Sequence, residues 1–348
     1  MGAPTRDEPL AADRAWAFDT VGSVSRTFAL SIDLLEEPVA SWICTGYLLC
    51  RTADTVEDEP SIPPERRADL LESYSAALAT DNDVAAESFL TAATDAGPAD
   101  GGDDWAALAD TDRALRLLYS FDPPVRAAMR GVIREMADGM AGFLRRHADN
   151  GGLRLETVDE LEEYCWYVAG TVGKLFTNLL GCYGTAGDPD PEDARAFALL
   201  LQLVNIAKDV RGDFEGENNV YLPGEWLAEE GLTHAAVGDP SATPAVARVV
   251  GRVVERAASY APGARRYLET LPEDDAGLLE AASLPYLLAL GTLRELRGRE
   301  REAVAEGGVK LSRPEVEALV GEMRRGITQA ELDRLAEQVR AEPYAVDR

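Results

Sequence analysis

Lysine is nearly absent from this chain of 348 residues. It occurs only at Lys174, Lys208 and Lys310, whereas 62 residues are acidic and the formal net charge is −28. This acidity argues against a nucleic-acid partner, because phosphate backbones are bound by basic surfaces. It suits a cytoplasm of high salt, where screening weakens the repulsion between carboxylates. We therefore expect a cytoplasmic protein of a halophilic type.

Cysteine and histidine are scarce as well. The four cysteines show no Cys-x-x-Cys spacing and lie in apolar segments, which indicates small buried side chains in a reducing compartment. The two histidines form no pattern typical of metal ligands. The sequence therefore indicates neither a disulfide framework nor a metal site built on histidine or cysteine.

Long hydrophobic runs are missing too. The most apolar stretch, 167–183, is interrupted by Lys174, so no run reaches the roughly 18 uncharged residues of a membrane-spanning helix. Residues 1–15 are charged and contain proline, unlike a secretory signal. We expect no transmembrane anchor, although a peripheral contact with a membrane surface is compatible with this sequence.

Strand patterns are almost missing, whereas helical periodicity is nearly continuous. No loop is long or flexible enough to serve as a domain linker. We predict one all-α domain over 1–348, with a core of about 14–325 and a surface loop at 81–104. Segments rich in Gly, Pro, Asp and Asn separate helical stretches that we place near 10–28, 38–56, 64–80, 107–118, 123–147, 157–184, 190–211, 244–269, 275–306 and 313–339.

Two Asp-x-x-x-Asp pairs lie inside apolar helical stretches: Asp54 with Asp58, and Asp209 with Asp213. Residues four apart share one face of a helix, so each pair places two carboxylates side by side. Two such pairs facing each other across a helical bundle would form a site for hard divalent cations. Mg²⁺ is typically held by one or two carboxylates together with water and substrate phosphates. The pairs therefore point to an enzyme that handles diphosphates.

The surroundings of these pairs matter more than their spacing. Chance alone gives about 11 acidic pairs four residues apart in so acidic a chain, most of them on solvated helix faces. These two pairs, however, follow apolar segments at 46–50 and 199–206 that ought to be buried. A carboxylate pair on a core helix needs a partner, and a metal ion is the usual one.

Further segments share an unusual mix of small, aromatic and basic residues. Glycines inside the helices at 136–143 and 164–173 cost about 1 kcal/mol each, which indicates either tight helix contact or room for a ligand. The arginine inside the apolar stretch 25–31 is equally compatible with a salt bridge at the edge of the core. The apolar helix at 285–293 leads to a basic spot at 309–313 in this acidic protein.

Together these segments resemble the squalene and phytoene synthases, a family that joins two prenyl diphosphates head to head. The resemblance runs from about Ser25 to Arg313, with the segments in the order and at the spacing of that family. The segments at 138–143, 164–170 and 309–313 look more like squalene synthases. The segment at 220–223 looks more like phytoene synthases.

The resemblance implies a mostly α-helical isoprenoid-synthase fold around a central apolar cavity. It implies that Mg²⁺, with Mn²⁺ as an alternative, and the prenyl diphosphates are held by Asp54, Asp58, Asp209 and Asp213. It implies substrate-binding roles for Arg26, Phe28, Arg51, Asn205 and Lys208, and catalytic roles for Tyr47, Arg51 and Tyr164. It loosely implies contact with NADPH at Lys310 and Arg313.

Three positions depart from the family pattern. Lys208 stands where relatives often have arginine, a change that keeps the charge but loses bidentate geometry. Asn218 and Asn219 stand where relatives usually have an arginine that contacts phosphate. These departures bear on the affinity for one diphosphate and on cofactor binding.

The residue types suit an ionisation followed by condensation. Arginine and a divalent cation neutralise a departing diphosphate, and an apolar cavity keeps water from the allylic cation. We expect squalene from two farnesyl diphosphates through a cyclopropyl diphosphate, with hydride from NADPH. The alternatives are a phytoene or dehydrosqualene synthase without NADPH and, less in keeping with the paired acids, a non-catalytic acidic helical binding module. A head-to-tail elongase would show Asp-Asp-x-x-Asp motifs, which are lacking.

Overall fold

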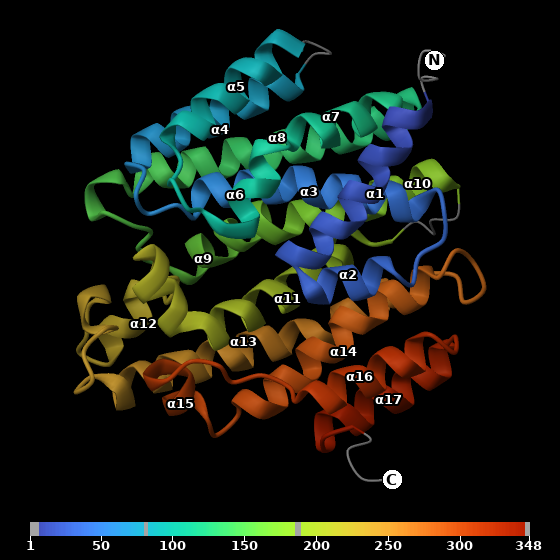
Figure 1. The fold of residues 1–348 in the computed structure, drawn as a ribbon. Helices are drawn as coiled ribbons and strands as arrows, with labels where there is room; N and C mark the ends of the chain where they lie inside the picture. The colour runs from blue at the N-terminus through green and yellow to red at the C-terminus, as the bar shows by residue number, and fades with distance from the viewer. Residues whose placement is uncertain (1–6, 80–82, 185–188, 345–348) are drawn as a thin grey trace. The chain divides into compact units, whose positions relative to one another are not determined.

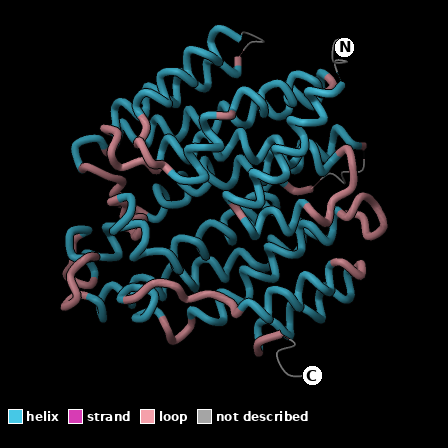
Figure 2. Tube along the Cα trace, viewed as in Figure 1, coloured by secondary structure: helices cyan, strands magenta, loops and turns pink. Residues whose placement is uncertain are grey.

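The computed structural model describes residues 7–79, 83–184 and 189–344. Within these ranges the chain is built from helices and contains no β-strand, as Figure 2 shows. A single isolated bridge joins Arg154 and Val220. The prediction of an all-α fold is therefore confirmed. The chain divides into two compact units, 1–146 with 174–184 and 147–173 with 185–348, and each is described by itself.

The first unit is arranged around one buried helix, α3. Of its 19 residues, 15 are buried, and it packs against α1, α4, α6, α7 and α8 (Figure 1). Burial on nearly all sides explains why this stretch is apolar throughout rather than striped. The helices of the unit are α1 (Asp7–Val24), α2 (Arg26–Ile32), α3 (Val39–Glu57), α4 (Pro64–Leu78), α5 (Asp83–Ala96), α6 (Gly102–Ala109), α7 (Thr111–Ser120), α8 (Pro123–Arg146) and, from Lys174 onward, α10 (Thr171–Tyr183).

The predicted surface loop at 81–104 is wrong for most of its length. Helix α5 covers 83–96, and α6 already begins at 102. Ala86, Phe89 and Ala93 follow helical spacing and are buried, and the Phe89 ring lies 4.7 Å from that of Tyr74 on α4. This short apolar stripe is enough to dock a helix, but the Gly- and Asp-rich residues after it dominate the composition of the segment.

The second unit is built around α11 and α13, which pack side by side along their lengths (Figure 1). Helices α16 and α17 both pack against α14. The elements of the unit are η1 (Ala148–Asn150), α9 (Val158–Cys165), η2 (Trp166–Gly170), α11 (Pro191–Gly212), η3 (Asp213–Glu217), α12 (Gly224–Glu229), η4 (His234–Ala236), α13 (Thr243–Glu269), α14 (Leu278–Leu296), α15 (Glu300–Ala305), α16 (Arg313–Met323) and α17 (Gln329–Ala341).

Several boundaries in this unit follow from specific residues. The stretch 275–306, expected as one helix, is broken after Leu296 because Gly298 adopts φ = +82°, a conformation that ends an α-helix. Helix α17 begins at a capping box formed by Thr328 and Glu331. Its side chains are buried at Leu332 and Val339, so packed residues continue beyond the expected core limit of 325. The extent of the domain as a whole stays a prediction.

None of the described helices combines the length and the hydrophobicity that a membrane span requires.

Candidate functional site

The first aspartate pair lies at the C-terminal end of α3. Asp54 is in the last turn, and the N–H of Asp58, the C-cap residue, donates to the Asp54 carbonyl at 2.8 Å. The carboxyl end of a helix carries partial negative charge, so two carboxylates there are unfavourable and a cation is favoured. The placement is costly for the fold and suited to binding a cation.

Both carboxyls of this pair are hard to ionise. The pKa of Asp54 is raised to about 7. Burial is the largest cause, Asp58 and Asp104 act in the same direction, and the Arg51 guanidinium opposes them. Burial likewise raises the pKa of Asp58 to about 6, against the opposing effect of Arg51 and Arg67. The positive charge of Arg51 and Arg67 therefore does not offset the effect of burial on these two carboxyls.

Arg51 is held by a partner that the sequence did not suggest. Its Nε and Nη2 donate to the two carboxylate oxygens of Asp104 on α6, each at 2.8 Å. Its Nη1 lies 3.9 Å from Asp54 Oδ2, too far for a hydrogen bond. Sequence reasoning missed Asp104 because it fell in the segment expected to be a surface loop.

Aromatic side chains flank the same end of the site. The ring of Phe28 on α2 stacks on that of Tyr47 on α3, with centroids 4.1 Å apart and planes at 19°. Burial raises the pKa of Tyr47 to about 12, so the phenol stays protonated at neutral pH. Tyr47, Arg51 and Asp54 follow at helical spacing and share one face of α3. Arg26, the first residue of α2, is exposed. The first unit thus brings together its predicted residues, with Arg26 at the edge.

The second aspartate pair lies where α11 continues into the π-helical turn η3. Asp209 lies in the last turn, and Asp213 is the C-cap residue and the start of the π-helical turn η3. Lys208 Nζ donates to Asp209 Oδ2. Asn205 precedes Asp209 by one turn and is exposed on the same face. All four predicted residues therefore lie on the last turns of α11 and the start of η3.

A buried hydrogen-bond chain links Tyr164 to the turn after this pair. The Tyr164 hydroxyl donates to that of Tyr221 at 3.1 Å, and the two rings stack with centroids 4.9 Å apart. Asn219 Nδ2 donates to the same Tyr221 oxygen at 3.0 Å, and the Asn219 backbone N–H donates to the Asp213 carbonyl at 2.9 Å. Asn219 is buried and structural, so its side chain does not replace a phosphate-binding arginine.

The small residues near Tyr164 serve packing. Gly173 lies where an added Cβ would be 3.5 Å from that of Ala198 on α11, and a Cβ on Gly170 would collide with the Trp166 ring. The segment 166–170 forms a π-helical turn, a feature often found at functional sites. Of the two explanations left open by the sequence, these contacts favour tight packing at Gly170, whereas at Gly173 a Cβ would make only an ordinary contact.

Lys310 and Arg313 lie at the loop between α15 and α16. Both side chains are exposed, and Arg313 Nε is paired with Glu317 Oε1 at 2.7 Å. The loop begins with Gly307 and Gly308, both at positive φ. The expected basic spot is thus partly neutralised, and its link to a nucleotide cofactor stays a prediction.

Each aspartate pair offers two oxygen-bearing side chains and no more. Across 7–79, 83–184 and 189–344, no group of three or more His, Cys, Asp or Glu is arranged to hold a metal ion by itself. Mg²⁺ commonly takes one or two carboxylates from the protein and completes its octahedron with water and phosphate. The donor set therefore fits a cation that arrives with, or is completed by, a phosphorylated ligand.

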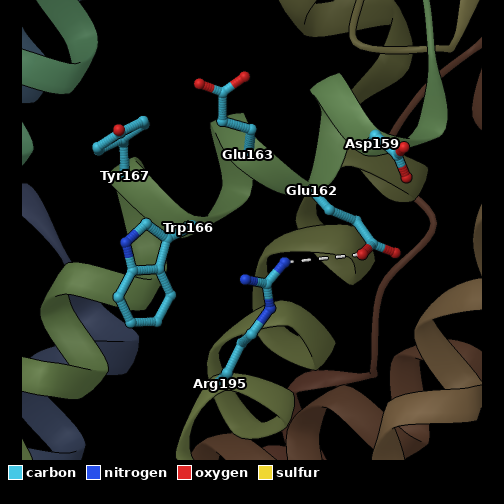
Figure 3. Close-up of a pocket in the computed structure, with 6 residues that line it drawn as sticks. All are labelled: Asp159, Glu162, Glu163, Trp166, Tyr167 and Arg195. Carbon is cyan, nitrogen blue, oxygen red and sulfur yellow. Dashed lines mark ion pairs between the residues drawn. The ribbon is translucent and has the colours of Figure 1, made fainter. Parts of the chain in front are cut away.

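A separate cavity of about 280 Å³ lies in the second unit. Figure 3 shows its lining, in which Arg195 is 3.7 Å from Glu162. None of the lining residues was predicted as a site residue. They are Asp159, Glu162, Glu163, Trp166, Tyr167 and Arg195.

Comparison with known proteins identifies related sequences. The model of the squalene/phytoene synthase family matches residues 21–315. The squalene synthase of Schizosaccharomyces pombe is 25% identical over 280 residues, 79% of this chain and 58% of that protein. The 15-cis-phytoene synthase of Enterobacter agglomerans is 37% identical over 149 residues, 43% of this chain and 48% of that protein. In these two comparisons the chain spans about half of each relative's length.

Solved structures share the fold. A structure of TcSQS with the ligand BPH1237 superposes with a TM-score of 0.78 at 24% identity, covering 97% of this chain and 94% of the other. A dehydrosqualene synthase structure gives a TM-score of 0.61 at 20% identity, covering 91% and 97%. The match of the family model over most of the chain, together with this fold, shows that the protein belongs to the squalene/phytoene synthase family.

Proposed function

We propose that the protein condenses two prenyl diphosphates head to head. The observation that carries this proposal is the crowding of Asp54 and Asp58 at the carboxyl end of the buried helix α3, together with a second aspartate pair at the same spacing where α11 continues into η3. The first pair does not improve the fold, since it puts negative charge where the helix dipole is already negative. Cation-assisted binding of diphosphate gives both a common purpose.

In each unit the pair would hold the divalent cation: Asp54 with Asp58, and Asp209 with Asp213. Mg²⁺, or Mn²⁺ as the alternative, would supply positive charge to the diphosphate leaving group. Arg51 would then contact the phosphate oxygens through Nε and Nη2, the two donors that hold Asp104 in this structure. This exchange is feasible because phosphate and carboxylate both present paired oxygens.

The aromatic residues have separate roles in this proposal. Tyr47 stays protonated at neutral pH and so donates a hydrogen bond to departing diphosphate, while its stacking with Phe28 keeps water away. The Tyr164 hydroxyl, which donates to Tyr221, would pass on the proton lost as the cyclopropyl ring closes, and the released diphosphate would be the final acceptor of that proton. Arg26, Asn205 and Lys208 bind substrate as polar groups at the ends of their helices.

We favour squalene, made from farnesyl diphosphate with NADPH, as the product. The supporting features are the segments at 138–143 and 164–170. Relatives named squalene synthase are also matched over more of this chain, 92% for the enzyme of Arabidopsis thaliana at 26% identity. The 15-cis-phytoene synthase match, higher in identity but covering 43% of the chain, favours the second candidate, a phytoene or dehydrosqualene synthase without NADPH. In either case we place the enzyme in the cytoplasm, with peripheral membrane contact for release of an apolar product.

The joint need for both aspartate pairs tests the proposed reaction. Asp54→Asn and Asp209→Asn should each abolish Mg²⁺-dependent release of diphosphate from prenyl diphosphates and leave the helical circular dichroism unchanged. Asp112→Asn, an exposed carboxylate on α7, is the matched control and should release diphosphate at the normal rate. Near-normal turnover in either of the first two variants would remove the metal-site assignment.

A further inference from the structure

The segment around Arg154 is fixed to the turn that follows the second aspartate pair. Arg154 and Val220 form the isolated bridge, and the Val220 N–H donates to the Leu153 carbonyl at 2.9 Å. In return the Leu153 N–H donates to Asn219 Oδ1 at 2.9 Å. The Asn219 N–H also donates to the Asp213 carbonyl. These hydrogen bonds together place the Arg154 backbone beside the end of η3.

Two unusual backbone positions sharpen this placement. Asn218 adopts φ = +57°, in the left-handed region that few residues other than Gly and Asn enter. A Cβ on Gly152 would lie 2.0 Å from the Asn218 carbonyl oxygen, so only glycine permits this close approach. The two chain segments that contain Gly152 and Asn218 therefore lie in close contact, and the Arg154 side chain extends to Asn218.

The Arg154 guanidinium has only neutral partners. Nη1 donates to the Leu153 carbonyl at 2.7 Å and to the Asn218 carbonyl, and Nη2 donates to Asn218 Oδ1 at 2.8 Å. Among the residues that the structure describes, no carboxylate pairs with it. Burial lowers the pKa of Arg154, as expected for a cation held without a counter-ion. In a chain of net charge −28, an arginine left in this condition is unexpected.

The three hydrogen bonds leave one edge of the guanidinium available. A guanidinium has five N–H groups in a fixed plane. The amide and carbonyl of Asn218 take the edge formed by Nη1 and Nη2, and the Leu153 carbonyl takes the remaining Nη1 proton. Within the described ranges, Nε and the second Nη2 proton have no partner. Arg51 uses the same two nitrogens, Nε and Nη2, to donate to Asp104. This edge of a guanidinium suits bidentate contact with a phosphate or carboxylate.

We propose that Arg154 binds the diphosphate at the second aspartate pair through its Nε and Nη2 edge. The inference rests on the proposed function and adds a substrate-binding residue that none of the sequence segments contains. Asn218 and the Leu153 carbonyl orient the guanidinium before substrate arrives, so little side-chain entropy is lost on binding. Arg154 supplies positive charge near the junction of α11 and η3, where the other cations, Lys208 and Arg211, are paired with Asp209 and Glu215.

Titration calorimetry with inorganic diphosphate and Mg²⁺ tests this role in the full-length protein. Arg154→Gln should weaken diphosphate binding about tenfold or more, because a charge-assisted hydrogen bond is worth about 1.5–3 kcal/mol. Arg154→Lys should fall between, since it keeps the charge and loses the fork. Arg248→Gln, which removes a surface arginine paired with Glu230 in the same unit, should bind within about twofold of the wild type.

A second variant separates binding from mere bracing of the turn. Asn218→Gly removes the two hydrogen bonds of the Asn218 side chain, one from Arg154 Nη2 and one to the Gly151 carbonyl, but it tolerates the positive φ and keeps the Asn218 carbonyl that Arg154 Nη1 contacts. It should weaken diphosphate binding by less than Arg154→Gln does, because the guanidinium and its charge remain, and Arg154→Gln should also raise the KM for the prenyl substrate. Equal losses in Arg154→Gln and Asn218→Gly would show that Arg154 only braces the turn and would overturn the inference.

The outcomes also distinguish this inference from the proposed function. If the wild type condenses prenyl diphosphates and Arg154→Gln, with normal circular dichroism, binds diphosphate equally well, the inference is wrong and the function stands. If the wild type shows no Mg²⁺-dependent diphosphate binding, both are wrong.

Discussion

At the scale of single residues, the first aspartate pair destabilises the fold. Asp54 and Asp58 are crowded at a negative helix end, and burial raises both pKa values, to about 7 and about 6. A carboxyl whose pKa is higher in the folded than in the unfolded state destabilises the fold once it ionises. Such a cost is typical of residues kept for function rather than stability.

Asp54→Asn should therefore stabilise the metal-free protein. For Asp54 the folded-state pKa is above the ordinary 3.8, so its favourable contribution is complete below about pH 4 and is lost as the pH rises toward 7. Removing the charge should raise the free energy of unfolding by on the order of 1–3 kcal/mol at pH 8, and by less at pH 5. Urea unfolding at both pH values, with a chelator present, measures this. A destabilised variant at pH 8 would show that Asp54 is a structural residue.

Tyr164→Phe should lower turnover with little loss of stability. The variant keeps the ring that stacks on Tyr221 and removes only the hydroxyl that donates to it. The lost hydrogen bond should cost about 1 kcal/mol of stability. Tyr221→Phe is the matched control, since it breaks the same hydrogen bond and leaves the Tyr164 oxygen in place. Activity is measured as condensed product per minute. Full activity of Tyr164→Phe would show that Tyr164 contributes to packing only.

The sequence identified the acidic, aromatic and basic residues of each segment but not their distant partners. Asp104 and Arg154 carry no motif of their own, because a lone Asp in an acidic chain and a lone Arg near a glycine pair are common. Their roles follow from tertiary placement, 53 residues from Arg51 in one case and 64 residues from Asn218 in the other. Only a stronger local signal, such as the glycine required at 152, could have indicated the second.

At the scale of helices, local periodicity predicted most elements, and tertiary contacts decided the rest. The long stretches that became α8 and α13 carry clear helical periodicity, whereas α3 and α11 were recognised by their length and apolar character. Helix α5 was missed because it has only three buried apolar residues, and these are buried by packing against α4, which the local sequence does not indicate. The break between α14 and α15 was missed because a single glycine in a charged stretch is a weak signal.

Helix α1 should depend on a single buried carboxylate. Asp13 accepts from Arg113 Nε at 2.9 Å and from Arg116 Nε at 2.8 Å, both on α7. Burial would raise the pKa of Asp13, but these hydrogen bonds outweigh it and lower the pKa. Asp13→Asn should thus destabilise the protein by about 1–3 kcal/mol at neutral pH, because it weakens charge-assisted hydrogen bonds from two partly exposed arginines.

The effect of Asp13→Asn should also depend on pH. A lowered pKa contributes stability above the ordinary value of 3.8, and this contribution is lost as the pH falls below it. The difference between wild type and variant in urea unfolding should therefore shrink toward pH 3. Asp112→Asn, which removes an exposed partner of Arg116, should change stability by less than about 1 kcal/mol. Equal effects of the two variants would contradict the assignment.

At the scale of the whole molecule, the net charge of −28 should make stability depend on salt. At about 0.01 M ionic strength the Debye length reaches about 30 Å, so carboxylates repel one another across much of the surface. The melting temperature should rise between dilute buffer and molar KCl. A melting temperature that stays constant or falls would show that the surface ion pairs, and not the excess of acids, dominate the electrostatics.

The central claim concerns the reaction, and analysis of its products by gas chromatography tests it most directly. The enzyme should be supplied with Mg²⁺ and with C15 or C20 prenyl diphosphate, with and without NADPH. We predict squalene from the C15 substrate with NADPH, and a cyclopropyl diphosphate or a more unsaturated C30 product without it. Lys310→Gln should weaken the reductive step more than the condensation. Phytoene from the C20 substrate, formed equally with or without NADPH, would contradict the squalene assignment, and no condensed product from either substrate would contradict the account as a whole.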